Sequence, residues 1–213
     1  YSLYYYNNIV YVGRNFSSLL GSSRTYVAAI NAASGTINSW QPQNIAMYPY
    51  CFLASGSTIY IGGTGYVYCF SQPVLSNIGA FDISSGALLT TFDCRTNNRV
   101  RTMLLDGGQL ILGGDFTFIN SVERWRLIMV SPTTGAIVQT PAGVQGSVYS
   151  LSVYNGVLYV GGTFNAVGSS GAIGGNARVN RSTGLYIGTN EWGNVLYSKV
   201  VNGMLFIASS TIG

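Results

Sequence analysis

Residues 148–162, VYSLSVYNGVLYVGG, decide the fold. Apolar residues alternate with small or polar ones over 148–153, as expected for a strand with one buried face. The pair Asn155-Gly156 follows, and these residue types readily take the positive φ of a two-residue hairpin turn. A second apolar run then ends in the pair Gly161-Gly162. The stretch therefore predicts a β-hairpin that closes on two glycines.

The same phrase recurs along the chain, at 1–13, 52–63, 100–114 and, in part, 195–207. The position that ends the second strand falls at 13, 62, 113, 161 and 208, with spacings of 49, 51, 48 and 47 residues. Glycine occupies this position everywhere except at Ala208. A second marker, a small-residue turn closed by glycine, keeps the same period at 33–35, 84–86, 133–135 and 182–184. Two independent markers thus share one period of about fifty residues.

Each period contains two hairpins and hence four strands. Radial repetition of four-stranded sheets at about forty to fifty residues is the signature of a β-propeller. We therefore predict an all-β fold, a β-propeller of four-stranded blades, with about 4.5 blades in this chain and about five to seven in the complete domain. A β-solenoid is the rival architecture, but its coils are usually shorter than this period.

A single propeller domain is expected to span residues 1–213, with repeats at about 1–47, 48–99, 100–147, 148–194 and, in part, 195–213. The sequence has no initiator methionine and breaks off inside a repeat. We therefore expect it to be part of a longer protein whose targeting signals cannot be judged from these residues.

Two phrases resemble known propeller repeats. Residues 158–164, LYVGGTF, followed by a loop of small residues and by 177–180, are similar to the delta-sixty repeat, and 112–117 matches the same phrase. The double glycine, with Trp40 and Phe92 closing fourth strands, resembles kelch repeats. The resemblance implies a propeller of the kind found in large secreted bacterial proteins and phage tail components. It implies no particular chemistry, because propellers carry many unrelated functions.

Composition points to the same setting. Only 8% of the residues are charged, whereas the chain contains 28 glycines and 16 tyrosines. So little charge is unusual for a cytosolic protein and suits an extracellular or virion-surface protein, or one packed in an assembly. No apolar run approaches the length of a spanning helix, so no membrane insertion is expected. One lysine, Lys199, and a net charge of +4 do not favour nucleic-acid binding.

The loops between the second and third strands are predicted at 14–25, 64–77, 115–126 and 163–176, on one face of the propeller. Arginine concentrates there and in the connection before 100, with tryptophan beside it. Guanidinium next to indole suits planar or anionic partners. The candidate ligand-binding residues, for an acidic or neutral glycan, are Arg24, Arg99, Arg101, Arg124, Trp125 and Arg126. The alternative is that these arginines only solvate the surface, pair with nearby acids or contact a neighbouring subunit.

The cysteine and acidic residues do not suggest a catalytic or metal-binding arrangement. A Cys69–Cys94 disulfide is sterically possible on the long-loop face, whereas Cys51 is expected to be a buried thiol. The chain has no histidine, which excludes histidine triads and most zinc sites. Asp115 and Glu123 form the one carboxylate pair worth considering for glycoside hydrolysis, but Asp115 is more readily read as a turn cap. We expect no enzymatic activity, no cofactor and no metal.

The sequence thus predicts a binding or adhesion propeller displayed on a virion tail or cell surface, whose partner is a glycan or a protein receptor. The first alternative is a structural assembly subunit or rigid spacer of a virion or appendage, which the apolar composition of 47% favours. A secreted glycan-active enzyme is a distant alternative. Glycan binding that survives removal of the 124–126 loop would count against the first function. A stable, soluble monomer in isolation would weaken the second.

Overall fold

A computed structural model describes residues 2–69, 72–170, 174–189 and 194–210. Its secondary structure is all β: the described residues form antiparallel strands and no helix. The strands are grouped into four successive sheets and a terminal hairpin.

The first two sheets occupy the N-terminal part of the chain. The first sheet has the order β1-β2-β5, with strands β1 (Ser2–Tyr6), β2 (Ile9–Gly13) and β5 (Val27–Asn31). A bridge between Ile30 and Ile37 adds a fourth segment to it. The second sheet contains β6 (Ile45–Ser55), β7 (Thr58–Cys69), β8 (Gln72–Leu75) and β9 (Ile78–Asp82). A short hairpin, β3 (Ser18–Leu19) with β4 (Ser22–Ser23), lies between β2 and β5.

The third and fourth sheets repeat one meander order. The third sheet contains β10 (Val100–Asp106), β11 (Gln109–Gly114), β14 (Leu127–Val130) and β15 (Ile137–Gln139). The fourth contains β16 (Val144–Tyr154), β17 (Val157–Val167), β18 (Asn176–Asn180) and β19 (Tyr186–Gly188). A second short hairpin pairs β12 (Phe118–Ile119) with β13 (Val122–Glu123), and the terminal hairpin pairs β20 (Asn194–Val201) with β21 (Met204–Ser210).

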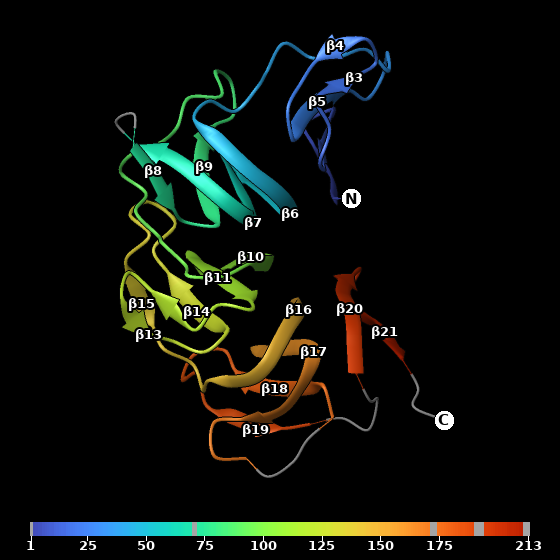
Figure 1. Ribbon diagram of the computed structural model, residues 1–213. Helices are drawn as coiled ribbons and strands as arrows, with labels where there is room; N and C mark the ends of the chain where they lie inside the picture. The colour runs from blue at the N-terminus through green and yellow to red at the C-terminus, as the bar shows by residue number, and fades with distance from the viewer. Residues whose placement is uncertain (1, 70–71, 171–173, 190–193, 211–213) are drawn as a thin grey trace.

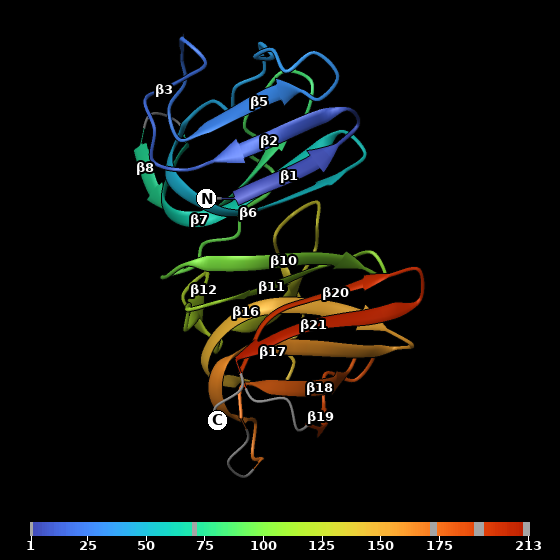
Figure 2. The same cartoon turned by 90° about the vertical axis from the view of Figure 1, so that its right-hand side faces the viewer.

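The sheets follow one another along an arc. In Figure 1 the strands β6, β10, β16 and β20 lie on the inner side of the arc, and β8, β15 and β19 lie on the outer side. The first strand of each sheet contacts the first strand of the next. The side view shows the first sheet at one end of the series and the β20–β21 hairpin in front of the fourth sheet (Figure 2).

The turns that the sequence marks are formed by backbone with positive φ. Asn155 and Gly156 have φ of 49° and 72°, and Gly107-Gly108 behaves in the same way, as a two-residue hairpin turn requires. The glycines of the second marker all lie between 70° and 76°. A side-chain oxygen at the end of each third strand, or directly after it, accepts backbone N–H bonds across this turn. These residues are Asn31, Asp82, Ser131 and Asn180. Hydrogen bonds from Ser84 and Ser85 lower the pKa of Asp82 to about 2.

The first glycine of each pair has a packing role. A Cβ on Gly113 would lie 2.6 Å from a methyl carbon of Val148, in the first strand of the following sheet. A Cβ on Gly62 would lie 2.9 Å from a methyl carbon of Val100. A Cβ on Gly161 would lie 2.6 Å from a methyl carbon of Val195. Glycine therefore recurs every fifty residues because each sheet packs its second strand closely against the next sheet. The buried apolar clusters lie at these junctions, and Phe81 and Phe116 are fully buried within them.

The predicted bounds of two loops are wrong in part. Residues 64–77 and 163–176 were expected to be irregular, but β7 continues to Cys69 and β17 continues to Val167. Both extensions are paired, because β6 begins early enough for Ile45 to face Val67, and β16 early enough for Val144 to face Val167. The other two predicted loops contain the short hairpins β3–β4 and β12–β13.

Candidate functional site

The β12–β13 hairpin is attached to the connection that leads into the third sheet. A bridge joins Thr96 to Ile119, and the Asn97 Oδ1 accepts the N–H groups of Thr117 and Phe118 at 2.8 and 3.0 Å. Asn120 makes the reciprocal contacts, accepting from the Arg95 N–H and donating to the Asp93 carbonyl oxygen. Two asparagine side chains thus hold these segments in one fixed arrangement.

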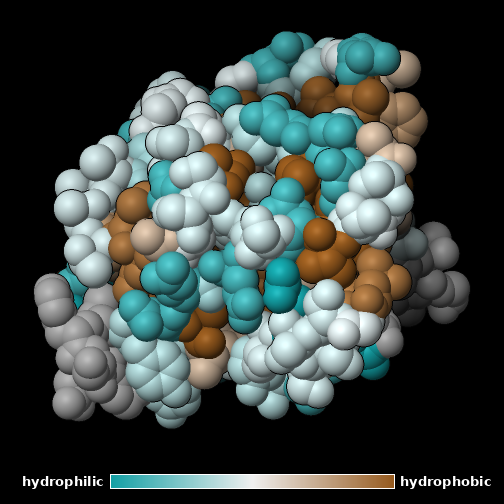
Figure 3. Space-filling model, turned by 90° about the horizontal axis from the view of Figure 1, so that it is seen from above, coloured by the Kyte–Doolittle hydropathy of each residue, from teal (hydrophilic) through white to brown (hydrophobic). Residues whose placement is uncertain are grey.

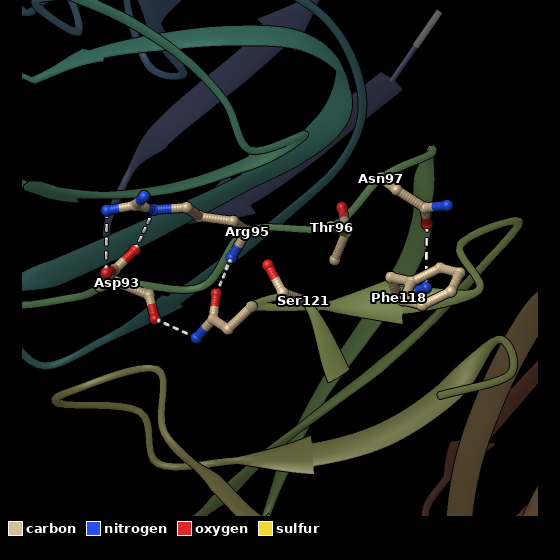
Figure 4. Close-up of a pocket in the computed structure, with 7 residues that line it drawn as sticks. Asp93, Arg95, Thr96, Asn97, Phe118 and Ser121 are labelled. Carbon is tan, nitrogen blue, oxygen red and sulfur yellow. Dashed lines mark hydrogen bonds and ion pairs between the residues drawn. The ribbon is translucent and has the colours of Figure 1, made fainter. Parts of the chain in front are cut away.

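A hollow of about 670 Å³ opens between these segments. It is lined by Asp93, Arg95, Thr96, Asn97, Phe118, Asn120 and Ser121. Figure 4 shows Arg95 and Asp93 joined as a planar fork, with Nε–Oδ1 at 2.6 Å and Nη2–Oδ2 at 3.0 Å. Both side chains remain about half exposed, at 52% and 55%. The Phe118 ring, 42% exposed, supplies an apolar surface in the same hollow. We call it the Phe118 hollow.

Two smaller hollows continue this surface past the hairpin. One, of about 420 Å³, is lined in part by Phe118, Trp125 and Arg126. The other, of about 380 Å³, is lined in part by Trp125 and Arg124. Trp125 is 40% exposed, and its indole N–H donates to Glu123 Oε1 at 2.7 Å. Two aromatic side chains, Phe118 and Trp125, therefore line a row of three hollows.

A β-bulge recurs in the first strand of the later sheets, and it redirects one side chain each time. The bulged residues are Tyr50, Arg101, Tyr149 and Leu196. The Arg101 guanidinium lies between two of these neighbours, 5.6 Å from the Tyr50 ring centroid and 5.1 Å from that of Tyr149. Cation–π attraction of this kind fixes the arginine between successive sheets.

Asp115 completes this cluster. Its carboxylate accepts a hydrogen bond from Arg101 Nε at 2.7 Å, and Arg99 Nη1 lies 3.9 Å from its second oxygen. Burial acts to raise the pKa of Asp115, but hydrogen bonds from Arg101 and Ser147 and the two guanidinium charges outweigh it, so the pKa is lowered. The hydrogen bond to Asp115 raises the pKa of Arg101. The carboxylate is therefore held ionised.

Asp115 predicts a pH dependence of stability. Because its pKa is lower in the folded chain than in the unfolded chain, its contribution is complete above about pH 4 and is lost as the pH falls through the folded pKa. We expect Asp115→Asn to cost about 1–2 kcal/mol of unfolding free energy at pH 7 and progressively less below pH 4. Urea titrations of both proteins at several pH values measure this, and a pH-independent difference would contradict it.

The six candidate binding residues do not form one cluster. Arg99 and Arg101 meet at Asp115, and Arg124, Trp125 and Arg126 surround the two smaller hollows. The remaining residue, Arg24, directly follows β4 and donates to the carbonyl oxygens of Ser23 and Asn38.

Most of the arginine side chains also have a structural role that the sequence did not reveal. Arg124 donates to the Glu123 carbonyl oxygen, and Arg126 donates to that of Val144 at 3.1 Å. The Nε atoms of Arg24 and Arg124 are buried without a partner among the described residues. These guanidinium groups hold backbone in place, so the expected shared face of ligand-binding arginines is reduced to smaller, separate groups.

Of the two cysteines in the sterically possible Cys69–Cys94 disulfide, the side chain of Cys94 is described. Cys94 is a free, buried thiol in the apolar cluster between the second and third sheets, and burial raises its pKa to about 12. The Cys69 side chain lies outside the described part of the structure. Cys51 is also free, and burial raises the pKa of its thiol as well.

Within 2–69, 72–170, 174–189 and 194–210, no three histidine, cysteine, aspartate or glutamate side chains gather closely enough to hold a metal ion. In the same ranges no helix has the length and apolarity needed to cross a membrane.

Sequence reasoning overlooked the Phe118 hollow. Its asparagines, Asn97 and Asn120, act by binding backbone more than twenty residues away, and this pairing leaves no local pattern. The Tyr50–Arg101–Tyr149 arrangement had a usable signal, because each residue lies at the same repeat position, one after Pro49, Val100 or Val148. Aligning the repeats at the bulge would have found it.

The similarity of this chain to known proteins is a similarity of fold. No protein-family model matches the chain, and no curated protein matches it. Among solved structures, the computationally designed Ika8 protein is similar with a TM-score of 0.65 at 14% identity, over 97% of this chain and 54% of the Ika8 chain. The computationally designed Ika4 protein is similar with a TM-score of 0.56 at 14% identity, over 81% of this chain and 97% of its own. This chain spans about half the length of the Ika8 chain. At such low identity the likeness concerns the fold alone.

Proposed function

We propose that the chain is a non-enzymatic binding module, built as a set of β-propeller blades, that recognises glycans through the Phe118 hollow. The propeller interpretation is supported by four successive antiparallel sheets with a period of about fifty residues, of which the third and fourth are four-stranded meanders. It is also supported by β6, β10, β16 and β20, which lie along the inner side of an arc (Figure 1). The observation that carries the binding proposal is the combination, in one open hollow, of an exposed aromatic ring with a fixed arginine–aspartate fork.

The chemistry of the hollow suits a sugar. The apolar face of a pyranose ring can pack on Phe118, while its hydroxyl groups both donate and accept hydrogen bonds. Asp93 accepts such bonds and Arg95 donates them, and their mutual fork fixes both groups in advance. Asn97 and Asn120 each use one amide N–H within the described contacts, and an amide carries two. Because Arg95 is neutralised by Asp93, we propose a neutral glycan as the ligand.

The proposal of binding without catalysis rests on the acidic residues. Glycoside hydrolysis requires two carboxyl groups available on either side of the scissile bond. Asp115 is held by Arg101, and Glu123 accepts the indole N–H of Trp125. Both members of the candidate catalytic pair are therefore engaged in holding side chains. Display on a virion tail or cell surface fits the low charge of the chain and its likeness to kelch and delta-sixty repeats.

The glycan proposal is tested with Phe118→Ala. A glycan array with neutral and acidic sugars identifies the ligand of the unmodified chain, and calorimetric titration then measures its affinity. We expect Phe118→Ala to weaken binding at least about tenfold, because the ring supplies the apolar contact. Asp93→Asn is expected to weaken it to a similar extent by removing an acceptor and breaking the fork.

Val122→Ala is the matched control. Val122 is 41% exposed on the facing strand β13 and does not line the Phe118 hollow. Its affinity should equal that of the unmodified chain. Absence of binding to every glycan on the array would overturn the proposal and leave a protein receptor as the partner to examine. Equal losses in Phe118→Ala and Val122→Ala would also count against it.

A further inference from the structure

The surface of the β12–β13 hairpin continues beyond the Phe118 hollow. Phe118 lines this hollow and also the neighbouring one of about 420 Å³. Trp125 lines that second hollow and also the third, of about 380 Å³. Each aromatic side chain is thus shared by two successive hollows, so the three hollows are continuous. We call the second and third hollows together the Trp125 extension.

Strand pairing places the two aromatic side chains on the same side of the hairpin. Phe118 is paired with Glu123, and directly paired residues of antiparallel strands point to the same face. The pairing continues past Glu123, since the Arg124 N–H donates to the Thr117 carbonyl oxygen at 2.7 Å. The Trp125 indole N–H donates to Glu123 Oε1 at 2.7 Å, which brings the indole to this face as well. Diagonal neighbours of this kind lie roughly 7–8 Å apart, so a ligand that contacts both rings must be longer than one that contacts a single ring.

The contacts of Trp125 restrict its indole while leaving it accessible. Its carbonyl oxygen accepts the N–H groups of Leu127 at 2.8 Å and Val144 at 3.1 Å. A Cβ on Gly143 would lie 3.3 Å from the Cβ of Trp125, so the following connection also packs closely against this residue. The side chain nevertheless remains 40% exposed. A restricted side chain loses less rotamer freedom when a ligand packs on it.

Hydrogen-bonding groups beside the ring distinguish the Trp125 extension from other exposed apolar residues. The view from above shows apolar residues at the surface in small groups among polar ones (Figure 3), so exposure alone does not mark a site. Arg126 lines the second hollow and Arg124 the third. Each donates to one backbone carbonyl oxygen and carries further N–H groups. Glu123 lines both hollows, and its carboxylate can accept hydroxyl groups in addition to the indole N–H.

We infer that the glycan of the Phe118 hollow is a linear oligosaccharide that extends along the β12–β13 hairpin, with one sugar ring on Phe118 and a later one on Trp125. This inference rests on the proposed function and adds the length and the course of the ligand. A chain of pyranose units alternates apolar ring faces with hydroxyl groups, and the hairpin presents two aromatic rings with donors and acceptors beside them. Each of the three hollows lies in the range of about 300–1,000 Å³ that is usual for small-ligand sites. Because linked units make the second contact intramolecular, affinity should rise with chain length.

A length series tests the inference. The probes are neutral homo-oligosaccharides of glucose, galactose, mannose, xylose and N-acetylglucosamine, each as the monomer and the tetramer, and calorimetric titration measures their affinities. For the sugar that binds, we expect the tetramer to bind at least about tenfold more tightly than the monomer. Trp125→Ala should bring the tetramer affinity close to that of the monomer and leave the monomer affinity unchanged. Phe118→Ala should weaken the binding of both.

Trp125→Phe and Tyr66→Ala are the controls. Trp125→Phe keeps an aromatic ring and should retain most of the gain with length. Tyr66, 45% exposed on β7, lines none of the three hollows, so Tyr66→Ala should bind both lengths like the unmodified chain. Equal affinities for monomer and tetramer would overturn the inference and leave the Phe118 hollow as a site for one sugar, and so would a gain with length that survives in Trp125→Ala. Absence of binding to every probe would instead overturn the proposed function, and this inference with it.

Discussion

Replacing Gly114 by alanine is expected to destabilise the chain by about 3 kcal/mol or more, a large part of the free energy of unfolding of a typical domain. A Cβ at this position would overlap the carbonyl oxygen of Arg99 and lie 3.1 Å from the Cα of Val100. Both obstacles are backbone atoms, at the start of β10 and in the residue before it, so no side-chain rotation relieves them. Gly162 has the same relation to Ser147, which makes the requirement a property of the repeat.

Urea unfolding followed by tryptophan fluorescence measures this effect. Gly108→Asn is the matched control: Gly108 has a φ of 71°, a conformation that asparagine tolerates, and open space where its Cβ would lie. We expect this variant to change the free energy of unfolding by less than about 1 kcal/mol. Equal stability of Gly114→Ala and the unmodified chain would show that the second strand does not approach the first as closely as described.

Replacing Arg181 by alanine is expected to cost about 2–3 kcal/mol of unfolding free energy. Arg181, 11% exposed, extends from the last turn of the fourth sheet to the third sheet. Its guanidinium donates to the Asp106 carboxylate and carbonyl oxygen, each at 2.6 Å, and to Gln109 Oε1 at 2.9 Å. Truncation leaves the Asp106 carboxylate, still 34% exposed, without its partner, so part of the cost is offset by solvent.

The Arg95–Asp93 pair provides the comparison. It has the same 2.6 Å contact, but both side chains are about half exposed. Arg95→Ala should therefore lower the stability by less than about 1 kcal/mol. Arg181→Lys should restore only part of the loss, because an ammonium group cannot form the forked contacts of the guanidinium. Equal losses for Arg181→Ala and Arg95→Ala in urea unfolding would contradict the assigned role of burial.

The parts of the fold that depend on neighbouring residues in the sequence were predictable. Turn residues such as Asn155-Gly156 impose a backbone conformation wherever they stand, and repetition showed that the same hairpin recurs. The junction glycines were visible as a spacing, although their reason, close approach of the next sheet at Val148, appears only in three dimensions. The strand extensions of β7 and β17 were missed, because they depend on partners such as Ile45 rather than on their own composition.

The candidate site was predicted less well, and the arginines explain why. Arginine in a loop suggests a ligand, but the sequence does not show whether a guanidinium finds a carbonyl oxygen nearby. Arg124 and Arg126 do find one, whereas Arg95 is paired yet exposed. The Phe118 hollow arises from contacts between two segments that are distant in sequence. Such long-range side-chain-to-backbone bonds cannot be read from one chain without structure.

The contacts between neighbouring sheets also determine which changes of repeat number the chain tolerates during evolution. The main contacts of each sheet are with the sheets immediately before and after it. In such an array stability is close to a sum of terms for each unit and for each contact between neighbouring units. In-register recombination that adds or removes one fifty-residue unit recreates the same boundary on both sides. Duplication and deletion of whole units are therefore the changes that this architecture tolerates best.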